Sequence, residues 1–236
     1  MMLRRLFFAF AMLFSASAVA QQTKFDRPGQ TVKANVMPKG SLQVEAGVDL
    51  NEKYYLGNVR YGLFDGFELS TNIQDMSYMV GDMEFSDPHW SIGGKFNIFE
   101  GEGTVSQISL YDVVGLPLFG DGNVWENRLG VALTSQLGET SYLAGNVHWS
   151  MIEAQKSSIG YSLQFGTQFS RKGWGLYAEH FGQYYEFNNL YTFGGLGLTY
   201  SFGDKVQADI GYVAELEEFS ETSSAQIQLG LSVRLF

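Results

Sequence analysis

His148 and Ser150 are the two residues whose types and spacing most resemble a catalytic pair. A serine can act as a nucleophile when a neighbouring histidine accepts its proton. On a β-strand, a spacing of two places both side chains on the same face. The apolar residues Val147, Trp149 and Met151 would then occupy the opposite face. The two candidate groups therefore belong to a polar face, and the surroundings of that face decide what they can do.

Charged residues stand singly at comparable polar-face positions along the chain. They are Glu45, Arg60, Glu68, Lys95, Arg128, Glu179, Asp209 and Arg234. An unpaired charge in a narrow space is costly, so we expect these residues to pair with one another. They could also line a path for a solute, and that role is compatible with pairing. The expected partners are Arg27, Arg60 or Lys95 for Glu45 and Glu68, and Arg128 or Arg234 for Glu179 and Asp209.

Metal and cofactor sites find little support in the sequence. There is no cysteine, which excludes disulfides and thiolate metal sites. Acidic residues gather in two stretches, at 82–87 and 215–221, but their spacing fits no calcium loop. Solvation explains these stretches, and the alternative is divalent-cation binding beside anionic lipopolysaccharide. We predict no metal site and no cofactor.

Twelve stretches alternate apolar and polar residues with a period of two, which is typical of β-strands. In the last stretch, apolar residues recur at every second position from Ala225 to Leu235. A strand of that length rises about 35 Å, enough to cross a bilayer at a tilt. The stretches cover roughly residues 40–50, 54–63, 66–74, 89–99, 104–112, 123–137, 141–152, 158–170, 174–186, 191–202, 205–214 and 223–236.

The composition excludes several classes of protein. The 236 residues include 19 Phe, 13 Tyr, 4 Trp and 28 Gly, and only 17% are charged. A disordered chain would have fewer aromatic and more charged residues. The formal net charge of −10 argues against nucleic-acid binding, which needs clustered Lys and Arg. The mean hydropathy of −0.08 is compatible with a membrane barrel, because a barrel hides its polar residues inside.

Residues 1–20 have the three parts of a secretory signal peptide: a pair of arginines, an apolar run and a small-residue cleavage site. We expect cleavage after Ala20. Loss of the two arginines changes the formal charge from −10 to −12.

Residues 21–39 show no strand pattern and contain Asp26 and Arg27. Their prolines and glycine make a helix improbable. They could fold into a barrel as a plug or hang in the periplasm as a tail, and both alternatives stay open at this point.

The connections between the twelve stretches alternate between short and longer. The short ones lie at 64–65, 100–103, 138–140, 171–173 and 203–204. Outer-membrane barrels have short periplasmic turns and longer extracellular loops. We therefore predict an all-β fold, an antiparallel transmembrane β-barrel of about twelve strands over residues 40–236. Closure of twelve tilted strands gives a radius of about 12 Å, most of which side chains would fill.

In such a barrel the polar faces point into the lumen and the apolar faces meet lipid. His148 and Ser150 would then face the lumen, whereas a lipid-modifying enzyme needs them at the lipid-facing surface. We therefore expect a polar lumen pair and no catalytic residues.

Several short stretches, taken in order, resemble the outer-membrane family named for the MetA pathway of phenol degradation, also labelled simply "transporter". The resemblance implies an outer-membrane barrel and the passage of hydrophobic compounds. The C-terminal Phe236 departs from the pattern, because Leu235 continues the outward alternation in its place. The matching stretches are Asp26-Arg27-Pro28-Gly29, Pro38-Lys39-Gly40, Gln43-Val44-Glu45-Ala46-Gly47, Arg60-Tyr61-Gly62-Leu63, Phe67-Glu68-Leu69, Leu116-Pro117, Glu179, Gly197-Leu198-Thr199-Tyr200 and Gln207-Ala208-Asp209.

The functional expectation is a passive outer-membrane transporter or channel for a small solute in a Gram-negative bacterium. One alternative is a structural or adhesive barrel that transports nothing. Another is a lipid-modifying barrel enzyme that uses His148 and Ser150. The expected partners are outer-membrane lipid and lipopolysaccharide, the outer-membrane assembly machinery and a small-molecule solute.

Overall fold

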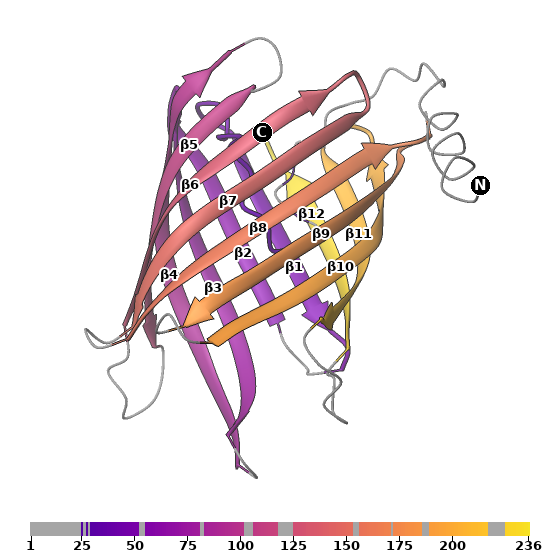
Figure 1. The fold of residues 1–236 in the computed structure, drawn as a ribbon. Helices are drawn as coiled ribbons and strands as arrows, with labels where there is room; N and C mark the ends of the chain where they lie inside the picture. Colours follow the sequence, from indigo (N-terminus) through magenta and orange to yellow (C-terminus); the bar gives the residue numbers. More distant parts are fainter. Residues whose placement is uncertain are drawn as a thin grey trace, which may run out of the picture.

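The computed structural model is a single closed β-barrel (Figure 1). The expected signal peptide and Asp26 lie outside the described residues, and only the backbone is described at 55, 74–80, 83–89, 117, 152, 156, 185 and 189. Among the described residues, no helix is long and apolar enough to cross a membrane. The described residues are 25, 27, 29–51, 55–80, 83–101, 106–117, 125–152, 156–170, 172–185, 189–216 and 225–236.

Twelve antiparallel strands form the barrel, which confirms the predicted fold. Each strand pairs with its neighbours in sequence, and β1 pairs with β12 to close the sheet. Closure leaves no sheet edge with unpaired backbone groups. The strands are β1 (Leu42–Asp49), β2 (Tyr55–Phe64), β3 (Phe67–Val80), β4 (Met83–Glu100), β5 (Gln107–Pro117), β6 (Glu126–Leu137), β7 (Ser141–Ile152), β8 (Lys156–Gln168), β9 (Trp174–Tyr185), β10 (Asn189–Phe202), β11 (Val206–Glu215) and β12 (Gln226–Arg234).

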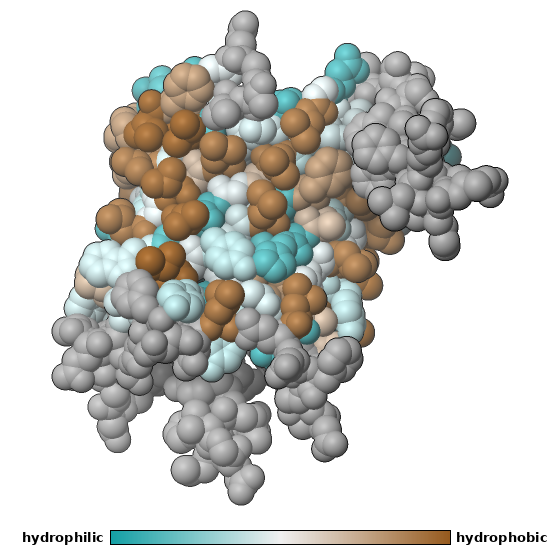
Figure 2. Space-filling model, in the orientation of Figure 1, coloured by the Kyte–Doolittle hydropathy of each residue, from teal (hydrophilic) through white to brown (hydrophobic). Residues whose placement is uncertain are grey.

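The two faces of the sheet differ in polarity, as the period of two predicts. On β12, Leu229 and Leu231 are exposed on the outer surface, whereas Ser232 points inward and is fully buried. Figure 2 shows apolar residues gathered over the upper and middle part of one outer face, with pale and hydrophilic residues among them. An apolar outer surface is stable only where lipid, rather than water, surrounds it.

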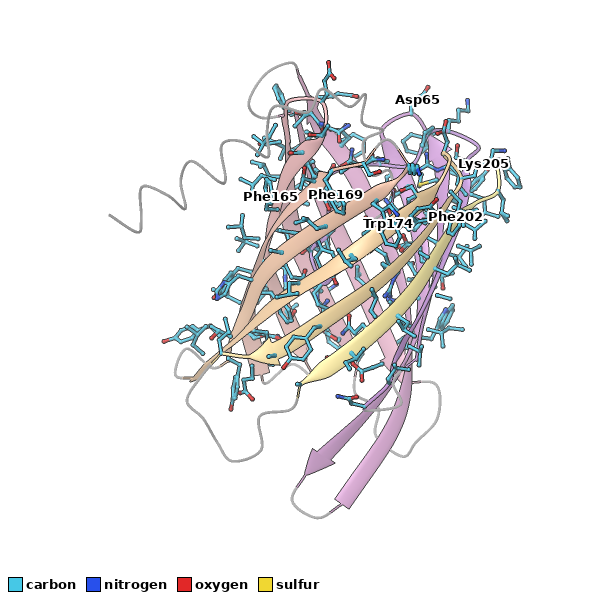
Figure 3. The ribbon with its side chains drawn as sticks, turned by 90° about the vertical axis from the view of Figure 1, so that its right-hand side faces the viewer. Asp65, Phe165, Phe169, Trp174, Phe202 and Lys205 are labelled. Carbon is cyan, nitrogen blue, oxygen red and sulfur yellow. The ribbon has the colours of Figure 1, made fainter. Side chains whose placement is uncertain are left out.

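One end of the barrel carries the turns at 65–66, 101–106, 138–140, 169–173 and 203–205, and we call it the turn end. Gly66 and Gly203 have positive φ angles there, which glycine adopts without steric cost. Phe169, Trp174 and Phe202 are exposed on the outer surface below these turns (Figure 3). Such aromatic residues are typical of the girdle at a membrane interface. The opposite end is called the loop end.

The bounds of three strands correct the sequence prediction. The stretches at 66–74 and 89–99 left residues 75–88 as one of the longer connections, but β3 and β4 continue through this region and pair up to Val80 and Met83. The hairpin extends beyond the rest of the barrel (Figure 1). The expected strand at 104–112 is instead β5, which runs to Pro117 because its outward face continues through Val114 and Leu116.

Candidate functional site: the lumen and its N-terminal segment

Residues 29–39, with Phe25 and Arg27, are the described part of a stretch that we call the N-terminal segment. It runs inside the barrel (Figure 1). It is hydrogen-bonded to inward-facing side chains on β3, β6, β9 and β11, which lie on different sides of the closed sheet. A chain outside the barrel could not reach all four strands.

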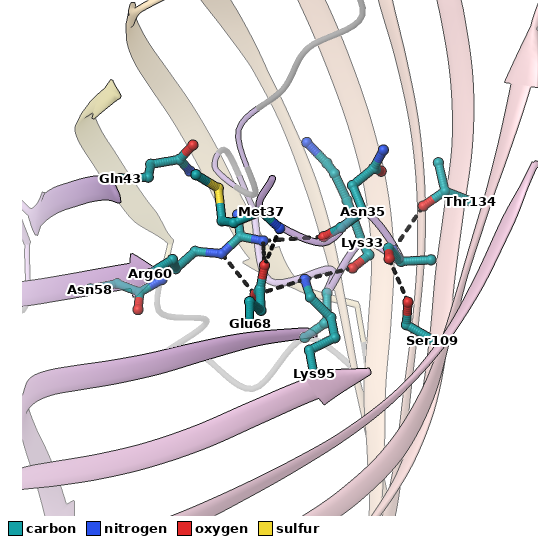
Figure 4. A network of polar contacts seen from close by, with 12 residues as sticks. Lys33, Asn35, Met37, Gln43, Asn58, Arg60, Glu68, Lys95, Ser109 and Thr134 are labelled. Carbon is teal, nitrogen blue, oxygen red and sulfur yellow. Dashed lines mark hydrogen bonds and ion pairs between the residues drawn. The ribbon is translucent and has the colours of Figure 1, made fainter. Parts of the chain in front are cut away.

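The segment enters beside an ion cluster on β2, β3 and β4 (Figure 4). Oε2 of Glu68 lies 2.7 Å from Nη2 of Arg60, and Oε1 lies 3.3 Å from Nζ of Lys95. Oε2 also accepts a hydrogen bond of 2.8 Å from the backbone N–H of Met37. Arg60 and Lys95 each donate to a backbone carbonyl of the segment as well. Glu68 thus pairs with two of the basic residues proposed for it and holds the segment at the same time.

Neutral side chains on β5, β6 and β7 hold the middle of the segment. The backbone N–H of Ala34 donates to Oγ1 of Thr134 at 2.9 Å, and its carbonyl accepts from Oγ of Ser109 at 2.5 Å. Nδ2 of Asn146 donates to the backbone carbonyl of Val32 at 3.4 Å. The barrel wall therefore supplies the partners that this non-helical, non-sheet backbone requires.

Glu179 on β9 holds the next part of the segment. Its Oε2 accepts from the backbone N–H of Gln30 at 2.9 Å and from Oγ1 of Thr31 at 3.4 Å. Gly29 precedes these residues with a φ of 93°. A Cβ added to Gly29 would lie 2.3 Å from Oε2 of Glu179. Glycine therefore serves both the backbone conformation and the close approach of the carboxylate.

Arg27 spans β11 and β1 further along the lumen. Its Nη2 lies 3.1 Å from Oδ1 of Asp209, and its Nε lies 3.4 Å from Oδ2. The backbone N–H of Arg27 donates to Oε1 of Glu45 at 3.4 Å, and its carbonyl accepts from Nε2 of Gln207 at 2.9 Å. The bidentate guanidinium and the backbone thus fix this end of the segment to two strands.

The pairing expected for Glu179 and Asp209 is wrong, because both bond the N-terminal segment instead of Arg128 or Arg234. Arg128 pairs with Glu126 of its own strand at 2.9 Å. Nη2 of Arg234 donates at 3.1 Å to Oε1 of Gln43 on β1, near the turn end. The physical reason is position: Arg128 stands on β6, several strands away from β9 and β11, and Arg234 lies four residues along β12 from Gly230, the residue that faces Asp209.

His148 and Ser150 both point into the lumen. Ser150 is fully buried, and its Oγ has no hydrogen-bond partner in the described part of the chain. Nδ1 of His148 lies 3.4 Å from Oδ1 of Asn146, and its ring lies against Gly160. The histidine is thus not hydrogen-bonded to the serine, which a nucleophile and its base require. The arrangement does not support the lipid-modifying alternative.

A cavity of about 190 Å³ lies between the segment and the loop end. We call it the loop-end cavity. Its floor is formed by Arg27 and by residues 29–32, and its walls come from β1, β2, β3 and β12 together with Arg128 of β6. In the described parts of the chain, no cluster of His, Asp and Glu could hold a metal ion.

The charged lumen residues were predicted from the sequence, whereas the neutral residues that bond the segment were not. Ser109, Thr134, Asn146 and Gln207 carry much of the contact with the segment. Their inward position could be read from the alternation along each strand. Their partners could not, because nothing in residues 21–39 says which strand each backbone group meets.

No family model matches the sequence, and no curated protein matches it. The family resemblance noted above therefore stays a resemblance. Solved structures do match the fold, at low sequence identity.

The KdgM porin in complex with disordered oligogalacturonate superimposes with a TM-score of 0.62 at 8% identity, over 83% of this chain and 99% of that chain. The NanC porin gives 0.61 at 9% identity, over 82% of this chain and 100% of that chain. An outer membrane channel from Pseudomonas putida F1 gives 0.62 at 13% identity, over 88% of this chain and 100% of that chain. These likenesses concern the fold.

The outer surface of this chain's own barrel is apolar. The chain has a closed β-barrel fold like that of these porins and this outer membrane channel.

Proposed function

We propose that the protein is a passive outer-membrane channel for a small solute, and that its own N-terminal segment restricts the lumen. The observation that carries this proposal is the hydrogen bonding of the segment to inward side chains around the barrel. The similarity in fold to porins and channels supports a channel role.

The inner wall favours a polar solute over the hydrophobic one that the family resemblance implies. Buried inward positions are occupied mainly by amide, hydroxyl and charged side chains, including Gln43, Ser109, Gln164, Gln207 and Ser232. An apolar solute would strip water from these groups and offer no hydrogen bonds in return.

The test compares the conductance of the refolded mature protein with that of a barrel lacking residues 21–39. The deletion removes the lumen contacts but leaves every strand pair from β1 to β12 intact. We expect it to raise the single-channel conductance several-fold, with the barrel still folded by its heat-dependent mobility on gels. Unchanged conductance in a folded barrel would contradict the proposed restriction. A barrel that passes no solute in either form would favour the structural alternative.

A further inference from the structure

Three inward carboxylates lie on one side of the lumen, within the consecutive strands β9 to β12 and β1: Glu179, Asp209 and Glu45. All three bond residues 27–31 of the N-terminal segment. Among the described residues, Arg27 is the one cationic side chain that is hydrogen-bonded to any of them. The wall gives Glu45 and Glu179 neutral amide donors. The segment, and not the wall, therefore supplies the cation that meets these carboxylates.

The wall provides a fitted place for the guanidinium of Arg27. Asp209 faces Gly230 across β11 and β12, and Gly230 faces Gly47 across β12 and β1. A Cβ added to Gly47 would lie 2.3 Å from Nη1 of Arg27, and a Cβ added to Gly230 would lie 2.4 Å from its Nε. We call Asp209, Gly230 and Gly47 together the Asp209 site. It combines a carboxylate that takes two bonds with backbone that leaves room for a guanidinium and for no further side chain.

The Asp209 site adjoins the loop-end cavity. Arg27 and Gly47 are both among the residues that line this cavity. The side chain of Arg27 is 10% exposed, whereas that of Asp209 is 1% exposed. Arg27 thus covers the carboxylate, and a solute that enters from the loop end reaches Asp209 once Arg27 has left it.

Passage of a solute requires the segment to leave the lumen, and its departure uncovers the carboxylates. Asp209 then loses both bonds from Arg27, and Glu45 loses a backbone N–H donor. A carboxylate without a partner in a narrow lumen is costly. A cationic solute restores the missing charge, a neutral solute does not, and an anion is repelled. A guanidinium group also restores the two parallel bonds that Arg27 makes.

From these features we infer that the Asp209 site binds a small solute that carries a guanidinium group, and that Arg27 occupies the place of this solute while the segment is in the lumen. The inference rests on the proposed channel function, because it assigns the solute class for that channel. Its test measures competition with Arg27 and needs no flow to be observed.

The experiment uses the full mature protein, residues 21–236, in detergent micelles with the single change Ala34→Cys. Ala34 is fully buried and the chain has no cysteine, so the rate at which a maleimide labels position 34 reports release of the segment. The probes are methylguanidinium and its uncharged analogue methylurea, at an ionic strength held constant with KCl. A ligand that binds only the released form shifts the equilibrium towards it. We expect methylguanidinium to raise the labelling rate about tenfold and methylurea to leave it unchanged.

Asp209→Asn removes the carboxylate and keeps the side-chain shape, and it is expected to abolish the response to methylguanidinium. Glu126→Gln is the matched control, because it removes one carboxylate from β6, away from the Asp209 site, and should keep the response. Should Asp209→Asn fail to fold, Gly47→Ala fills the site without changing any charge. It is also expected to abolish the response.

Arg27→Gln leaves the Asp209 site to the solute and tests the competition from the other side. The apparent dissociation constant of methylguanidinium, taken from the rise of the melting temperature with its concentration, should fall about tenfold, because no side chain competes for the site.

Equal acceleration by methylguanidinium and methylurea would overturn the inference, as would no acceleration by either. A response that persists in Asp209→Asn or Gly47→Ala would place the cation elsewhere and would also overturn it. An unchanged dissociation constant in Arg27→Gln would show that Arg27 does not occupy the solute's place.

These outcomes are independent of the conductance of the barrel that lacks residues 21–39. Failure of methylguanidinium to act, together with a raised conductance of that barrel, contradicts the inference and leaves the channel proposal standing. Competition with Arg27 in a protein that conducts in neither form supports the site and counts against the channel alone.

Discussion

The two ends of the lumen contain ion pairs of the same chemistry in opposite surroundings. Towards the turn end, Arg60 and Glu68 meet at 2.7 Å with side chains that are 2% and 4% exposed. Towards the loop end, Arg128 and Glu126 meet at 2.9 Å with side chains that are 42% and 31% exposed. The N-terminal segment covers the first pair and not the second.

This difference shows what the segment does to the barrel interior. Where it packs, water is excluded and each charge depends on its protein partners. Where it is absent, the wall is open to water and the cavity persists. The barrier to a solute is therefore expected in the half of the lumen that the segment occupies.

The largest effect is expected from Glu68→Gln, which removes the carboxylate shared by Arg60 and Lys95 but keeps the side-chain shape. Breaking a buried ion pair costs about 3–5 kcal/mol. Urea unfolding of the barrel in lipid vesicles measures this loss. The matched change is Glu126→Gln in the exposed pair, which should cost less than about 1 kcal/mol. Equal losses at the two sites would break the comparison between the two halves.

An arginine placed on each face of β12 tests which face of this strand meets lipid and which meets the lumen. Leu231 is 47% exposed on the outer surface, whereas Gln228 lines the loop-end cavity. An arginine on the lipid face near the midplane costs about 2–4 kcal/mol. We expect Leu231→Arg to impair folding into bilayers by this amount and Gln228→Arg to have little effect, measured by the folded fraction on gels. The reverse order would mean a register shifted by one residue.

A smaller effect is expected from Gly29→Ala, which affects the segment itself. The new methyl group would collide with Glu179, and the positive φ adds strain. A cost of about 1–3 kcal/mol should raise the opening of the segment by roughly 5- to 150-fold. The rate of trypsin cleavage after the buried Lys33 reports this opening.

Gly203→Ala serves as the control for this change. Gly203 also has a positive φ, but a Cβ would meet nothing within 4 Å, and the residue lies in the turn between β10 and β11. The substitution should leave cleavage after Lys33 unchanged. If both variants accelerate cleavage equally, the contact of Gly29 with Glu179 does not hold the segment.

The strands could be predicted because, in a membrane barrel, alternate residues of each strand face lipid and the polar interior. On β12, each of the residues from Ile227 to Leu235 falls on the expected face. The extension of β3 and β4 was missed because Pro88 and the acidic residues nearby resemble a loop. There the hairpin leaves the rest of the barrel, and apolar alternation is no longer required.

The lumen contacts could be predicted in part. Glu68, Arg60 and Lys95 stand on adjacent strands, so strand order alone brings them together. Asp209 and Glu179 could not be paired in this way, because their partners belong to a segment without periodicity. Its path depends on the sum of many backbone hydrogen bonds to side chains, and no local sequence pattern encodes that sum.

The most direct test of the account asks whether the segment occupies the lumen of the barrel in its membrane. The chain has no cysteine, so Ala34→Cys with Ala132→Cys introduces a single pair. Both alanines are fully buried in one cluster with Tyr111. Oxidation in outer-membrane preparations is predicted to join the tryptic peptides that carry residues 34 and 132. Ala34→Cys with Ala208→Cys, whose second site faces outward on β11, should give no bridge. A folded barrel in which the 34–132 bridge fails to form, or forms no better than the control, would contradict the account.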